Sequence, residues 1–267
     1  MTMSAGKTEY VLGATPVSGI GVSYLPADLE ESLTGSVVNV VFDDTGVADI
    51  TTLLESVADT DFEREQLKRI IEDDYEPEPW QVGEGLAECY LNHHRDCCFP
   101  WPDNRDIRKA GSSLPGADLV GFKDDGGTSR FTFGEVKTSG QNKYPPTDMY
   151  GRTGLKKQLE DLRDNVDIRD DLVKYIGYRA PKASWKANYI AASERYLHNN
   201  TDVSLFGILV RDVGPNENDL RERVDKLGKG CPIKMSIELM AIYLPPNSIK
   251  TLGTRTIAIR KGGKHNG

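Results

Sequence analysis

The sequence lacks any long apolar run. Its longest apolar stretches, such as SLFGILV and MAIYL, are the length of strands, whereas a helix that crosses a bilayer needs about 20 consecutive apolar residues. The N-terminal stretch MTMSAGKTEY has no apolar segment of the kind found in secretory signals. Cysteine is also scarce, with four residues and no CxxC pair. These absences predict a cytoplasmic protein with reduced thiols and no membrane partner.

Basic residues are scarce in one part of the chain only. Residues 1–80 contain 4 Lys or Arg against 17 Asp or Glu, and the other 187 residues contain 29 against 24. The net charge is therefore −13 in the first segment and +5 in the second. An acidic surface repels a polyanion, while a mildly basic one tolerates it. A solvated acidic surface with no further role explains the same numbers.

Apolar periodicity and turn residues divide the chain into alternating helices and strands. Helical spacing predicts helices, and runs of β-branched residues between Gly and Pro predict strands. The stretch EDDYEPEPW, residues 72–80, contains two prolines and predicts a junction. Strands are expected in 8–24, 36–43, 117–139, 187–193, 205–213 and 234–244, and helices in 47–72, 81–95, 155–173, 194–198 and 219–229.

This order predicts an α/β fold with a mixed sheet flanked by helices. At 267 residues and 38% hydrophobic content, the chain can bury a sizeable core. We expect an acidic α/β extension in residues 1–80, with a regulatory or docking role, and a main domain in residues 81–267.

The stretch FTFGEVKTSG places a glutamate and a lysine two residues apart on one predicted strand. Because side chains alternate along a strand, Glu135 and Lys137 share a face, and we assign Phe133 and Val136 to the other face. The turn sequence DDGG predicts a hairpin with the preceding strand, and Asp118 stands at the start of that strand. The hairpin therefore brings Asp118 toward Glu135 and Lys137.

Two readings fit this arrangement. Paired carboxylates repel each other in a poorly solvated site unless a cation lies between them. Oxygen ligands without cysteine or histidine suit Mg²⁺ or Mn²⁺, and a lysine beside the metal can hold a water and offset charge on a phosphate. The other reading is a salt-bridged strand on the solvated surface.

Asp118, followed across a hairpin by Glu135-x-Lys137, resembles the PD-(D/E)xK nuclease superfamily over roughly residues 81–175. The sequence departs from the pattern because GAD stands where the superfamily has its Pro-Asp pair. The resemblance implies a restriction-endonuclease-like fold, and a Mg²⁺- or Mn²⁺-dependent site in which Asp118 and Glu135 ligate the metal and Lys137 positions the attacking water.

The superfamily pattern also extends to neighbouring helices. A helix before the Asp strand supplies a further glutamate, and GEGLAECYL offers Glu88, with Glu84 one helical turn away as its rival. A glutamine on the helix after the Lys strand matches Gln158 in GLKKQLEDL. An ordinary place on a helix surface is the alternative explanation for these residues. Further candidates are Thr138 and Ser139 as supporting hydroxyls, and Arg152, Lys156 and Lys157 as DNA contacts.

A narrower resemblance points to one defence system. The chain length, the N-terminal α/β extension, the motifs GEGLAE and GEVKTS and the segment ELMAIYLPP are similar to the nuclease subunit family of the Hachiman anti-phage system. That family implies a DNA nuclease that works with a helicase partner. The sequence leaves open a non-catalytic subunit that binds nucleic acid or a partner, and a ribonuclease on the same scaffold.

Overall fold

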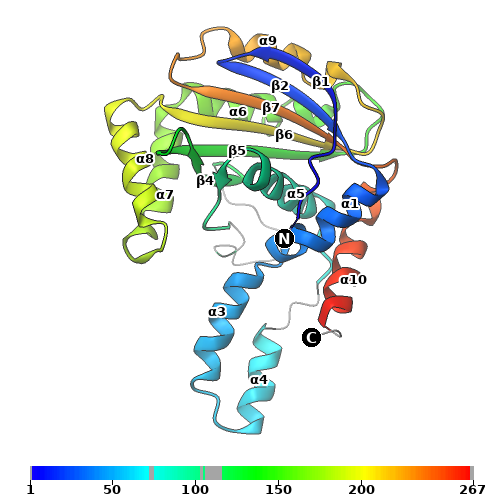
Figure 1. Cartoon of the computed structure of the whole chain (residues 1–267), viewed down its shortest axis with the longest axis vertical. Helices are drawn as coiled ribbons and strands as arrows, with labels where there is room; N and C mark the ends of the chain where they lie inside the picture. The colour runs from blue at the N-terminus through cyan, green and yellow to red at the C-terminus, as the bar shows by residue number, and fades with distance from the viewer. Residues whose placement is uncertain (1, 72–74, 103–104, 106–115, 265–267) are drawn as a thin grey trace.

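A seven-stranded mixed sheet runs through the molecule, with helices on both of its faces (Figure 1). The computed structural model describes residues 2–71, 75–102, 105 and 116–264. The strand order is β1-β2-β7-β6-β5-β4-β3. The strands are β1 (Lys7–Ala14), β2 (Val17–Ser23), β3 (Cys97–Cys98), β4 (Leu119–Asp124), β5 (Ser129–Ser139), β6 (Val203–Arg211) and β7 (Ser236–Tyr243). The predicted mixed α/β fold is confirmed.

The three central pairings are parallel and the outer ones are antiparallel. β5, β6, β7 and β2 pair in parallel, while β1, β4 and β3 pair antiparallel to their neighbours. Parallel neighbours need long crossovers, and helices supply them between β5 and β6 and between β6 and β7. Because β2 pairs with β7, the N-terminal strands belong to the same sheet as the rest of the chain.

One face of the sheet is covered by N-terminal helices together with the C-terminal helix. These are α1 (Pro26–Ser32), the π-helical turn η1 (Leu33–Val37), α2 (Val38–Val41), α5 (Pro79–His94) and α10 (Leu252–Lys264). Their core includes Leu29 and Leu86 and, from the sheet, Val136 and Ile208. The opposite face carries α6 (Leu155–Asp164), α7 (Val166–Gly177), α8 (Lys186–His198) and α9 (Arg221–Gly228).

Two further helices leave the body of the molecule. α3 (Asp44–Glu55) and α4 (Asp61–Ile71) form a hairpin that projects away from the sheet (Figure 1). Their contacts are mainly with each other and, for α3, with α2. Residues 72–74 of the predicted junction lie outside the described residues. Among the residues that are described, no helix is both long and apolar enough to cross a membrane.

Three local predictions are wrong. Residues 36–43 are helical through Val41, because Val37 and Val41 pack against α5 and tertiary contacts override the β-propensity of valine. Residues 187–193 lie inside α8, where Tyr189 and Tyr196 pack edge-on against Phe131. The helix expected over 155–173 is divided at Asn165, whose side chain caps α7.

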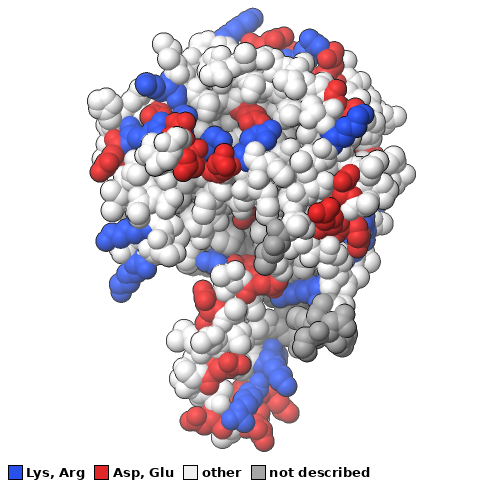
Figure 2. Space-filling view, in the orientation of Figure 1, with Lys and Arg blue, Asp and Glu red and all other residues white. Residues whose placement is uncertain are grey.

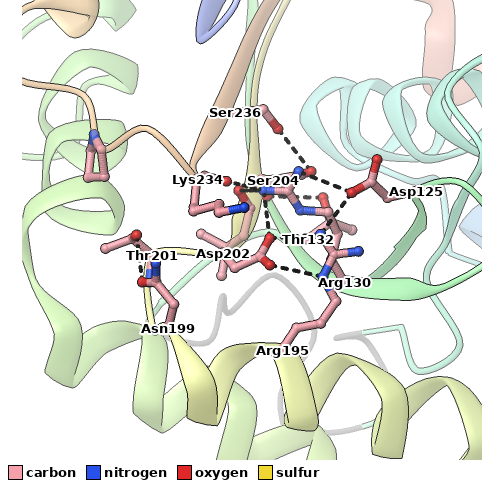
Figure 3. Close-up of polar contacts among 12 residues, drawn as sticks. Asp125, Arg130, Thr132, Arg195, Asn199, Thr201, Asp202, Ser204, Lys234 and Ser236 are labelled. Atoms are coloured by element: carbon pink, nitrogen blue, oxygen red, sulfur yellow. Dashed lines mark hydrogen bonds and ion pairs between the residues drawn. The ribbon is translucent and has the colours of Figure 1, made fainter.

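A buried polar cluster ties together the starts of three of the parallel strands, β5, β6 and β7 (Figure 3). Arg130 of β5 is 8% exposed and donates hydrogen bonds of 2.6 Å to the carbonyls of Val203 and Lys234. Its guanidinium also lies 3.3 Å from Asp202, which accepts a 3.0 Å hydrogen bond from Arg195 of α8. These contacts fix the register of β5, which carries the predicted site at its other end.

Candidate active site

The β4–β5 hairpin brings the three central candidate residues together. Leu119 pairs with Gly134, so Asp118 stands beside Glu135. The backbone N–H of Val136 donates a 2.7 Å hydrogen bond to Asp118 Oδ2, which fixes this carboxylate against β5. Lys137 Nζ lies 3.5 Å from Glu135 Oε2 and 3.9 Å from Asp118 Oδ2. The predicted juxtaposition of two carboxylates and a lysine is therefore present in the fold.

These side chains continue the sheet face that α6 covers. Phe131 and Phe133 belong to the core beneath α6, and alternation along the strand places Glu135 and Lys137 on the same face. Val136 belongs to the opposite core, beneath α5. The assignment of Phe133 to the face opposite Glu135 was therefore wrong. The apolar row leading to Glu135 shields it from water.

Glu135 is the most deeply buried of the candidates. Only 1% of its surface is exposed, and neither Oε1 nor Oε2 has a hydrogen-bond partner among the described residues. Burial, helped by the nearby charge of Asp118 and opposed by Lys137, raises the pKa of Glu135 to about 9. A surface strand held by solvated salt bridges would expose this carboxylate, so that reading does not fit Glu135.

The two α5 glutamates reach the same pocket as Asp118. This pocket has a volume of about 80 Å³ and is lined by Glu84, Glu88 and Asp118, together with Trp80, Gln81, Phe99 and Trp101. α5 approaches β5 closely, because a Cβ on Gly83 would stand 2.0 Å from Thr138 Oγ1. The structure therefore places both glutamates near Asp118 without choosing between them.

The metal shell predicted from sequence is not complete. Across the described ranges, no three His, Cys, Asp or Glu side chains come close enough to form a metal-binding group. The close pair is Asp118 and Glu135. Mg²⁺ in proteins commonly uses one or two carboxylates and keeps several waters, so this pair and its unsatisfied oxygens fit a hard divalent cation. Glu88 and Glu84 line a pocket together with Asp118, but they do not form a metal-binding group with Asp118 and Glu135.

The supporting candidates lie around the site in different ways. Thr138 Oγ1 and Gln158 Oε1 are buried without a hydrogen-bond partner among the described residues, Thr138 beneath α5 and Gln158 on α6. Ser139 instead donates a 2.6 Å hydrogen bond to Asp148 Oδ2. Its hydroxyl proton is therefore engaged by a carboxylate.

The three basic residues predicted to contact DNA do not form a cluster. Arg152 is exposed in the loop before α6. Lys156 Nζ lies 3.6 Å from Glu160, and Lys157 pairs with Asp161, each one helical turn along α6. Such pairs are typical of a solvated helix face. The structure therefore leaves Arg152 as the candidate most open to a phosphate.

One part of the site has no counterpart in the sequence analysis. Lys137 also lines a second pocket of about 310 Å³, formed by the loop and helix start that follow β5. The only available signal was the Pro- and Gly-rich segment YPPTDMYGRTG between the motif strand and the next helix. The pocket is lined by Lys137, Thr147, Asp148, Tyr150, Thr153 and Gly154.

Comparison with known proteins adds no assignment to this geometry. The sequence matches no model of a known protein family, and a search of curated proteins finds no match.

Proposed function

We propose that this protein is a metal-dependent nuclease that hydrolyses DNA phosphodiester bonds. The observation that carries the proposal is Glu135, a carboxylate with 1% exposure and two oxygens without hydrogen-bond partners, beside Asp118 and Lys137. Leaving a buried carboxylate without hydrogen-bond partners costs on the order of several kcal/mol. A protein tolerates such a group where it has a use.

Asp118 and Glu135 are the residues that would hold Mg²⁺ or Mn²⁺. A bound divalent cation would lower the pKa of a water and stabilise the charge that builds up on a phosphate. Cation binding requires Glu135 to release the proton that its raised pKa retains at neutral pH. The hydrogen bond from Val136 N–H to Asp118 Oδ2 holds the Asp118 carboxylate in place beside Glu135.

Lys137 supplies a positive charge between the carboxylate pair and the pocket beside α6. Its Nζ lies within 4 Å of both carboxylates, and its side chain also lines the pocket beside α6. An ammonium in this position would orient the attacking water and offset charge on the phosphate. Glu88 or Glu84 would hold further water from the pocket that they share with Asp118.

The resemblance to the PD-(D/E)xK superfamily and to the Hachiman nuclease family supports DNA as the substrate. It also supports a role as the effector subunit of an anti-phage complex with a helicase partner. The charge distribution agrees with this part of the proposal, because residues 1–80 carry a net charge of −13 and are unsuited to bind DNA. DNA would approach through the mildly basic remainder.

The test is to incubate the purified full chain with plasmid DNA, linear DNA and RNA, with and without Mg²⁺. We expect Mg²⁺-dependent cleavage of DNA that is lost in Asp118→Asn and in Lys137→Ala. Matched substitutions on the exposed face of α7, Asp171→Asn and Lys174→Ala, should leave cleavage unchanged. Cleavage of RNA alone would make the protein a ribonuclease. Full activity in EDTA would rule out the carboxylate mechanism.

A further inference from the structure

The α3–α4 hairpin exposes large apolar side chains on both of its helices. Ile50 and Leu53 on α3 and Val57 in the following turn are 53%, 68% and 67% exposed. Ile50 and Leu53 are spaced three residues apart, so they lie on one side of α3, and Val57 follows just beyond its end. Phe62 and Ile70 on α4 are 70% and 66% exposed. We call these five residues the outer stripe. Exposed large apolar side chains that gather on one element mark interaction sites.

The outer stripe is separate from the seam that joins the two helices. The seam uses another side of α3, where Val47, Thr51 and Leu54 are half-buried. On α4, Leu67 is the buried residue. The hairpin therefore already has the apolar contacts that hold it together. The outer stripe is additional apolar surface, and it lies on an arm that projects from the body (Figure 1).

The charges around the outer stripe restrict what can cover it. Residues 44–71 contain seven Asp or Glu and three Lys or Arg. Figure 2 shows acidic atoms, white surface and a patch of basic atoms along the arm. Like charges would oppose nucleic acid, an anionic lipid surface and a second copy of the same hairpin. A protein surface with an apolar groove bordered by Lys and Arg complements both features.

We propose that the outer stripe is the docking surface for another protein, whose apolar groove is bordered by Lys and Arg. The apolar side chains provide the affinity, and the surrounding carboxylates speed the encounter and exclude acidic partners. The inference rests on the proposed function only in taking this partner to be a member of the proposed complex. It does not depend on the cleavage reaction.

The probe is a labelled amphipathic helical peptide of about 20 residues, with Leu on one face and Lys on the other. A matched peptide carries Glu in place of Lys. Fluorescence anisotropy measures binding of both peptides to the full chain, and sedimentation measures its oligomeric state. The hairpin variant is Leu53→Asp with Phe62→Asp. Its control is Leu197→Asp with Ile233→Asp, which changes apolar residues outside the hairpin that are even more exposed, at 85% and 94%.

We expect the Leu–Lys peptide to bind the wild-type protein and to bind the hairpin variant at least about tenfold more weakly. The control variant should bind as the wild type does. Substituting Asp49→Asn, Glu55→Gln and Glu65→Gln together should reduce the salt dependence of binding. Equal affinity for the two peptides, or unchanged affinity in the hairpin variant, would overturn the proposal.

A dimer that dissociates in the hairpin variant would assign the surface to a second copy and also overturn the proposal. If the hairpin variant melts at a lower temperature than wild type, Leu53→Ser with Phe62→Ser repeats the test without adding charge. DNA cleavage by the hairpin variant should equal that of the wild type. Failure of docking is therefore distinguishable from failure of the nuclease assignment.

Discussion

The carboxylate site and the α3–α4 hairpin depart from ordinary burial in opposite directions. The site buries a carboxylate with two unsatisfied oxygens, whereas the hairpin exposes five large apolar side chains. Soluble proteins usually do the reverse in both cases. Each departure lowers stability or solubility, and we propose that each serves the binding of another component. A cation fits the first region and a protein partner fits the second.

The largest effect is expected from removing one carboxylate of the site. Asp118→Asn keeps the shape of the side chain and its contact with Val136 N–H, but it removes a charge that a metal ligand needs. Cleavage of DNA should fall by at least about 10³-fold. Single-turnover assays in Mg²⁺ measure this loss. Cleavage at the wild-type rate would place the active site elsewhere in the chain.

The second effect concerns the stability of the metal-free protein. Glu135→Gln removes a carboxyl group whose pKa is raised to about 9 in the folded protein. The folded state then holds a proton that the unfolded state has lost between about pH 4.5 and 9, so wild-type stability falls as the pH rises. We expect the variant to be more stable than wild type at pH 7 by roughly 3 kcal/mol, even though it is inactive.

Urea unfolding at several pH values in EDTA measures this difference. The gap between variant and wild type should vanish below about pH 4.5 and widen toward pH 9. Glu194→Gln, at an exposed position on α8, is the matched control and should change stability by no more than about 0.5 kcal/mol at any pH. A pH-independent gap for Glu135→Gln would mean that the carboxylate is solvated in the folded protein.

A third, smaller effect tests the packing that positions the α5 glutamates. A Cβ on Gly83 would lie 2.0 Å from Thr138 Oγ1, so Gly83→Ala must push α5 away from β5. The free energy of unfolding should fall by about 1–3 kcal/mol. At Gly228 of α9 a Cβ meets nothing within 4 Å, so Gly228→Ala should be neutral or stabilising by up to about 1 kcal/mol. Similar losses at both positions would contradict the close approach of α5.

The smallest effect is expected in the hairpin. Because Leu53 and Phe62 are mostly exposed, Leu53→Asp with Phe62→Asp should change the free energy of unfolding by no more than about 0.5 kcal/mol. Thermal unfolding of the isolated chain measures the change. A loss of several kcal/mol would show that these side chains are buried against the chain itself, and the contrast between the two regions would disappear.

The sequence was informative where local signals and tertiary packing agree. The DDGG turn and the alternation around Glu135 and Lys137 predicted the hairpin that brings Asp118 to them, and that hairpin is present. The same alternation was misapplied to Phe133. Valine-rich residues 36–43 were predicted as a strand, because the contacts that make them helical come from α5, where Gly85 lies 44 residues beyond Val41.

Two other features could not be predicted from local pattern. The burial of Glu135 depends on α6, which covers its face of the sheet. The sequence of the strand alone does not predict that a helix packs there. The α3–α4 hairpin was predicted as helical. An amphipathic pattern does not reveal whether the apolar residues of the outer stripe meet the body of the protein. The division at residue 80 remains a prediction about function, because β1 and β2 share the sheet of the main domain.

The most direct test of the central claim is a calorimetric titration of the full chain with Mn²⁺ at several pH values. The account predicts that the wild type binds the cation, and that binding releases a proton and strengthens by up to about tenfold per pH unit between pH 6 and 8. Asp118→Asn should lose this binding. Absence of binding, or equal binding by wild type and Asp118→Asn, would contradict a metal site at Asp118 and Glu135.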